Sequence, residues 1–112
     1  MSLNDKDFKR RENVAYPGRL AMIKAKEGFL IEKMMDGYMI FATGKNADSF
    51  NAMIQTNKTG ALYWHLIEKG TSLEELTLTA LNTFEGLDKD TAVQDIEEYL
   101  ENISPAIEIV EL

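Results

Sequence analysis

The dipeptide Asp36-Gly37 constrains this chain more than any other feature, because it separates two apolar runs of strand length, residues 29–35 and 38–43. Asp-Gly between such runs is typical of a two-residue type I′ hairpin loop, which needs positive φ at both loop residues. We therefore predict a β-hairpin around this loop. Its expected cross-strand pairs are Met35 with Tyr38, Lys33 with Ile40, and Ile31 with Ala42.

A third strand is predicted at residues 50–55, after a loop-like stretch at 44–49. Phe, Ala and Ile alternate there with Asn, Met and Gln, and this alternation is typical of a half-buried strand. Together with the hairpin, this strand would complete an antiparallel three-stranded meander.

The second half of the chain has helical spacing in three stretches. Asn57 can cap a first helix that ends near Gly70, and Thr71 or Ser72 can cap a second that ends before Gly86. A third helix is expected over residues 89–103, with Pro105 just beyond it. Residues 107–110 fit either a short terminal strand or a tail packed against the core.

Composition places this chain among single-domain proteins without disulfides. The 112 residues are 45% hydrophobic and include no cysteine, which allows one modest core and excludes thiolate chemistry. Residues 1–27 carry seven basic and four acidic residues, a net charge of +3, while residues 28–112 carry five basic and fifteen acidic residues, a net of −10. So acidic a domain is unsuited to nucleic-acid binding, because that binding depends on neutralising phosphates with Lys and Arg.

The N-terminal stretch lacks sustained periodicity and contains the breaker Pro17-Gly18. We therefore expect residues 1–25 to be a flexible charged arm and residues 26–112 to form the folded domain. No run has the length of a signal peptide's apolar region or of a membrane span, so a cytoplasmic location without membrane contact is expected.

Residues able to carry catalysis or bind a metal are scarce. His65 is the only histidine, with no second histidine or cysteine to share a metal or to form a nucleophile–base pair. The sequence has no GxGxxG, Walker A, HExxH or GxSxG motif. An acidic run beside an apolar stripe, as in the third helix, is usually a solvated face. We predict no catalytic residue, no metal site, no cofactor and hence no enzyme.

The predicted third strand carries no charge, lysine or proline that would blunt an exposed edge. If it lies at the edge of the sheet, its free N–H and C=O groups can accept another strand, which is the β-augmentation mode of peptide binding. A homodimer through the same edge is the alternative occupant.

Several stretches resemble the PqqD family, named for a protein of coenzyme PQQ (pyrroloquinoline quinone) synthesis. They are residues 55–64 (Gln-Thr-Asn-Lys-Thr-Gly-Ala-Leu-Tyr-Trp), residues 68–76, and residues 88–103 with the pair Asp95-Ile96. The resemblance implies an α+β, winged-helix-like domain in which a three-stranded antiparallel sheet is followed by three helices.

The same resemblance implies a peptide chaperone, or RiPP recognition element. Such a domain binds the leader of a ribosomally made precursor peptide and presents it to a modifying enzyme, often a radical SAM maturase. By position, the peptide-binding residues would be Ala52, Met53, Ile54, Gln55, Asp95, Tyr99 and Asn102.

A winged-helix DNA-binding transcriptional regulator is the alternative function, because fold alone does not decide function. A recognition helix needs Lys or Arg facing the groove of the duplex. The predicted third helix offers only Lys89, against five acids within it and Asp88 just before it. Its charge therefore favours the peptide over DNA.

Overall fold

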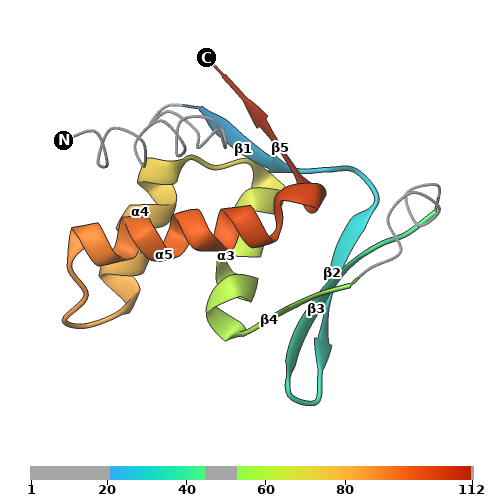
Figure 1. The fold of residues 1–112 in the computed structure, drawn as a ribbon, viewed down its shortest axis with the longest axis horizontal. Helices are drawn as coiled ribbons and strands as arrows, with labels where there is room; N and C mark the ends of the chain where they lie inside the picture. The colour runs from blue at the N-terminus through green and yellow to red at the C-terminus, as the bar shows by residue number, and fades with distance from the viewer. Residues whose placement is uncertain (1–20, 45–52, 112) are drawn as a thin grey trace, which may run out of the picture.

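The computed structural model describes residues 21–44 and 53–111, which form strands at both ends of the described chain and three helices between them (Figure 1). The elements are β1 (Met22–Ala25), β2 (Phe29–Met34), β3 (Gly37–Ala42), β4 (Ile54–Thr56), α3 (Lys58–Lys69), α4 (Leu73–Thr83), α5 (Lys89–Asn102), the 3-10 turn η1 (Ser104–Ala106) and β5 (Ile107–Val110). The predicted α+β class, with a three-stranded antiparallel sheet followed by three helices, is confirmed.

The β2–β3 hairpin forms, but the predicted pairing was wrong by two residues. Lys33 lies opposite Tyr38 and Met34 opposite Gly37, so the loop residues are Met35 and Asp36. Gly37 instead allows a close contact with β4. A Cβ added to this residue, whose φ is +156°, would lie only 2.9 Å from the carbonyl oxygen of Thr56. A slip of two residues preserves the period of a strand, so every side chain stays on its predicted face.

Among the described strands, β4 lies at an edge of the sheet, whose order is β2-β3-β4. Within the described residues it begins at Ile54 and includes Thr56, whereas Met53 precedes it and residues 50–52 of the predicted strand lie outside the described ranges. The predicted alternation holds where it can be seen. Ile54 packs against the core, while Met53 and Gln55 are exposed.

A second, two-stranded sheet joins the two ends of the described chain. β1 pairs antiparallel with β5, with Ile23 opposite Ile109, and the Ile23 side chain is fully buried. Residues 21–25, which the sequence assigned to the arm, therefore belong to the fold, while residues 1–20 lie outside the described ranges. The signal was weak, since β1 is only four residues long and its partner is about 85 positions away.

Polar side chains cap the three helices where the sequence predicted their starts. The Asn57 side chain accepts from the backbone N–H of Gly60, and that of Ser72 from Glu75. Asp88 accepts from the N–H of Thr91 at 2.8 Å, and this bond lowers the pKa of its carboxyl. These caps satisfy N–H groups that have no partner within the helix.

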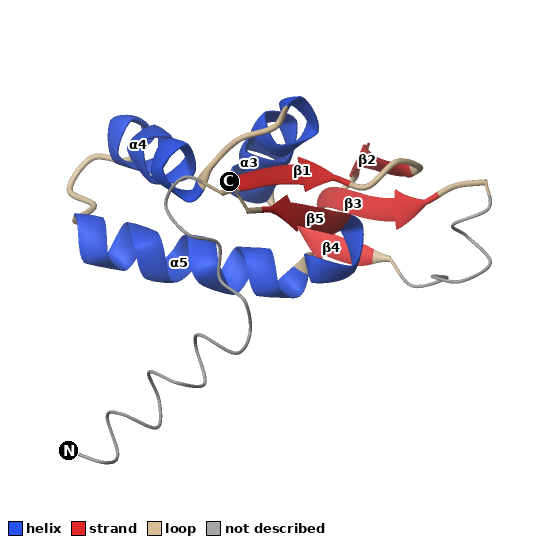
Figure 2. Ribbon diagram, turned by 90° about the horizontal axis from the view of Figure 1, so that it is seen from above, coloured by secondary structure: helices blue, strands red, loops and turns tan. Residues whose placement is uncertain are grey.

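Figure 2 shows the helices packed beside the strands of both sheets. The core contains buried side chains from the three helices and from β1, β2, β3 and β5. Its largest fully buried side chains are Trp64, Ile23, Ile40, Ile67, Leu76, Ile96 and Ile103. This packing holds α5 beside β4 and the start of α3. In the described part of the chain, no helix has the length and apolar character needed to cross a membrane.

Candidate functional site: an open groove beside the edge strand

An open groove of about 910 Å³ lies where the hairpin tip, β4, the start of α3 and the flank of α5 meet. The sheet contributes the hairpin-tip residues from Met34 to Met39, with Gln55 and Thr56. The helical wall comes from one face of α5, where Ala92, Asp95, Tyr99 and Asn102 recur at intervals of three or four residues. The groove therefore runs beside a sheet edge and along a helix.

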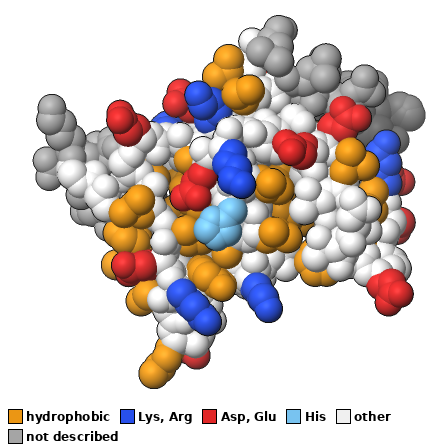
Figure 3. Space-filling model, turned by 180° about the vertical axis from the view of Figure 1, so that it is seen from behind, with side chains coloured by type: hydrophobic (Ala, Val, Ile, Leu, Met, Phe, Trp, Pro, Cys, Tyr) orange, Lys and Arg blue, Asp and Glu red, His pale blue; other side chains and the backbone are white. Residues whose placement is uncertain are grey.

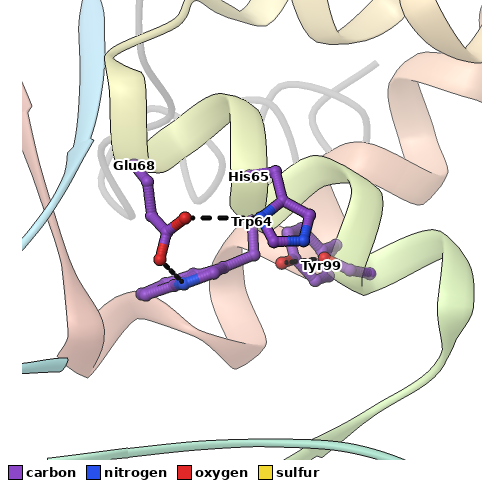
Figure 4. Close-up of polar contacts among 5 residues, drawn as sticks. Trp64, His65, Glu68 and Tyr99 are labelled. Carbon is purple, nitrogen blue, oxygen red and sulfur yellow. Dashed lines mark hydrogen bonds and ion pairs between the residues drawn. The ribbon is translucent and has the colours of Figure 1, made fainter. Parts of the chain in front are cut away.

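Two tyrosines form a rigid part of this wall. The rings of Tyr63 and Tyr99 meet edge to face, with centroids 5.4 Å apart. The hydroxyl of Tyr99 donates to the carbonyl oxygen of Gly60 at 2.7 Å (Figure 4). Burial raises the pKa of both phenols, and the nearby carboxylate of Asp95 adds to the rise at Tyr63. Both phenols are therefore neutral near pH 7, and the partly exposed ring of Tyr99 faces the groove with the buried ring of Tyr63 packed against it.

Gly60 lets three of these elements approach one another. A Cβ at this position would overlap the Thr56 hydroxyl oxygen of β4 and would lie 3.0 Å from a ring carbon of Tyr99 in α5. Its backbone also joins them, since its N–H donates to the side-chain oxygen of Asn57 and its C=O accepts from the hydroxyl of Tyr99. The Asn-x-x-Gly spacing of residues 57–60 thus combines a helix cap with a close contact.

The free side of β4 can be assigned from Gly37. Because the Thr56 carbonyl oxygen lies close to Gly37, it points toward β3. Backbone groups alternate sides along an antiparallel strand, so the N–H and C=O of Gln55 point away from β3, toward the open edge. An extended peptide placed there could pair with these groups and lie in the groove.

The sequence model of coenzyme PQQ synthesis protein D (PqqD) matches residues 35–104, more than half of the chain. The chain belongs to the PqqD family. The match runs from the hairpin loop to just past the end of α5, and so includes every described residue that lines the groove except Met34 of β2. Comparison with curated proteins and with solved structures found no match for this PqqD-family chain.

Four of the seven residues predicted to bind peptide line the groove: Gln55, Asp95, Tyr99 and Asn102. Ile54 contributes the backbone of β4 but packs its side chain against the core, and Met53 is exposed just before the strand. Ala52 lies outside the described residues. The structure thus places the two predicted segments on one groove.

Sequence reasoning missed the hairpin tip and Tyr63 as parts of this groove. Met34, Met35 and Met39 lie at its sheet end, and Met35 is 96% exposed. Methionine serves both core packing and adaptable binding surfaces, so the residue type alone did not predict a role in binding. The exposure of Met35 became evident only once the structure placed it in the hairpin loop. Tyr63 sits one turn from Gly60, on the face of α3 turned toward α5.

His65 lies at the surface of α3, as its position late in the predicted helix suggested. Its side chain is 63% exposed, and Nδ1 lies 3.4 Å from Oε1 of Glu68, whose other oxygen accepts from Nε1 of Trp64 at 2.9 Å (Figure 4). In Figure 3 the histidine is open to solvent among interspersed acidic and basic side chains. Among the described residues, no three His, Asp or Glu side chains converge as metal ligands.

Replacing Tyr99 by phenylalanine tests the hydrogen bond that joins α5 to α3. Tyr99→Phe should lower the free energy of unfolding by about 1 kcal/mol at neutral pH, measured by urea unfolding. Because the folded state raises the pKa of Tyr99, its stabilisation is present below the unfolded pKa of about 10 and is lost as pH rises through the folded value. The wild type should therefore lose more stability than Tyr99→Phe at alkaline pH. Equal losses would contradict the buried, neutral phenol.

Proposed function

We propose that this chain is a non-catalytic peptide chaperone of the PqqD type. It binds the leader segment of a ribosomally synthesised precursor peptide by strand addition to β4 and presents the peptide to a modifying enzyme. The observation that carries the proposal is the open edge of β4, whose outward N–H and C=O groups at Gln55 border the groove. Family membership supports a role in coenzyme PQQ synthesis or in the maturation of a similar peptide product.

The groove walls suit an extended peptide. Backbone pairing with β4 would supply affinity that is independent of sequence, while alternate side chains of the added strand would face the wall formed by α5. Tyr99, supported by the buried ring of Tyr63, offers rigid aromatic surface, and Met34 and Met39 offer flexible apolar surface that can adapt to different side chains.

The chemistry would belong to the partner enzyme, for which a radical SAM maturase is our candidate. A chaperone of this kind needs no catalytic group of its own, because holding the leader near the enzyme raises the effective concentration of the core peptide. Leu30, which does not line the groove, is 50% exposed and would stay accessible to that enzyme while the groove is filled.

The DNA-binding alternative finds no support in the charges of the site. Among the described residues, the charged side chains that line the groove are Asp36, Asp95 and Glu98, all acidic. A duplex placed against this surface would bring phosphates to carboxylates, which is unfavourable.

Titration of isotope-labelled protein with precursor peptides encoded near its gene tests the proposal. We expect the amide resonances of Met53, Gln55 and the groove face of α5 to shift, while those of β1 and β5 stay in place. A duplex DNA of random sequence serves as the negative control. If no candidate leader shifts the β4 amides, the proposed peptide binding is wrong.

A further inference from the structure

The groove has charged walls of a single sign. Asp36 stands at the hairpin turn, and Asp95 and Glu98 stand on α5, whereas no lysine or arginine is among the described residues that line the groove. None of the three carboxylates forms an ion pair or hydrogen bond with another described residue. The described part of the chain therefore leaves them without an ionic partner.

The surroundings make these carboxylates selective. Tyr63, Tyr99 and Leu87 lie in the same groove, so a bound peptide would displace water from both apolar and acidic surface. Covering a carboxylate without giving it a cation or hydrogen-bond donor is costly. Binding of an apolar or acidic peptide would therefore include this unfavourable desolvation free energy. A basic peptide would offset it by pairing with the carboxylates.

The geometry also suits a long cationic side chain. Asp95 and Glu98 are three residues apart on α5, about one helical turn, and Asp36 belongs to the opposite, sheet side of the groove. Alternate residues of a strand added to β4 would face α5 at a spacing of about 6.6 Å. A lysine or arginine at one such position could reach the α5 carboxylates while its stem covers the tyrosines.

We propose that the segment held in this groove is basic as well as apolar, with a lysine or arginine that pairs with Asp95 and Glu98. This inference rests on the proposed strand addition and names the chemical class of its ligand. The acidic charge of the groove is the property that distinguishes a cationic segment from other extended peptides.

The test uses synthetic peptides that share one alternating valine–threonine sequence and differ only at a central residue: lysine, glutamine or glutamate. Dissociation constants are measured by fluorescence anisotropy with the full chain, and the binding site is mapped by amide shifts at β4. We expect the lysine peptide to bind about three- to tenfold more tightly than the glutamine peptide, and the glutamate peptide to bind most weakly. Added salt should weaken only the lysine peptide.

Single variants of α5 identify the carboxylates that bind the cationic side chain of the peptide. Asp95→Asn and Glu98→Gln should each reduce the preference for lysine over glutamine. Glu101→Gln is the matched control, because Glu101 is exposed on the same helix but does not line the groove, and its variant should keep the preference.

The outcomes separate this inference from the proposed function. If all three peptides shift the β4 amides with equal affinity, strand addition stands and the charge preference is wrong. If both α5 variants keep the preference for lysine over glutamine, other residues bind the cation and the assignment to Asp95 and Glu98 is wrong. If no peptide shifts the β4 amides, both proposals fail; shifts that follow protein concentration instead would identify a second copy as the occupant.

Discussion

Proline at position 55 should abolish peptide binding while leaving the domain folded. The N–H of Gln55 points away from β3, so a proline there removes no bond of the sheet but removes a donor from the open edge. The ring would also stand where the incoming strand must approach. We expect the dissociation constant of any leader that binds by strand addition to rise at least about tenfold, which corresponds to about 1.4 kcal/mol.

The control is Gln55→Ala, which keeps the N–H and removes only the exposed side chain. It should bind within about twofold of the wild type, a difference below about 0.5 kcal/mol. Both variants should unfold cooperatively at urea concentrations near that of the wild type. Unchanged affinity in a folded Gln55→Pro variant would mean that the peptide does not pair with this edge.

The sequence was sufficient to predict that an unblunted strand exists, but not which of its N–H groups is free. Residues 50–55 contain no charged residue and no proline, and this is true whatever the register of the strand with its neighbour. The direction of each N–H depends on the pairing with β3, which is set by the contact between Gly37 and the Thr56 carbonyl. That contact joins residues 19 positions apart. Local turn chemistry does not take such a contact into account, so it placed Gly37 in the hairpin loop and not at the start of β3.

The helices were predictable because their signals are local. Asn57, Ser72 and Asp88 each cap a helix through an N–H three residues away, a relation that is visible in sequence. β1 was not predictable in the same way, because only Ile23 of its four residues is fully buried and its partner strand lies at the other end of the chain.

The sequence predicted the two segments of the candidate site, β4 and α5, but not the residues from the hairpin and α3 that lie between them. Residues on α5 and β4 could be carried over from the family resemblance, and four of them line the groove. Tyr63 and the hairpin methionines join them only through packing between elements. Long-range contacts of this kind depend on how the helices dock, which no short sequence pattern encodes.

Gly60 is the position where such a contact should have the largest effect on the shape of the groove. Gly60→Ala would ordinarily stabilise a helix interior by about 1 kcal/mol. Here the added Cβ overlaps the Thr56 hydroxyl and crowds the ring of Tyr99, so α3 must move away from β4 and α5. We expect a net loss of about 1–3 kcal/mol in the free energy of unfolding, measured in urea, and weaker leader binding.

A double-mutant cycle with Thr56→Ala tests this cause. Thr56→Ala removes the nearest clashing atom, although the Tyr99 ring carbon at 3.0 Å and the Cβ of residue 56 at 3.1 Å would still crowd the new methyl group. The double variant should therefore recover part of the stability lost in Gly60→Ala, with a coupling of at least about 0.5 kcal/mol. If the two losses simply add, the overlap with Thr56 is not what excludes a side chain from position 60. If Gly60→Ala is instead more stable than the wild type and binds a leader normally, α3 does not need this close approach, and the Tyr99 hydrogen bond is what holds α3 beside α5.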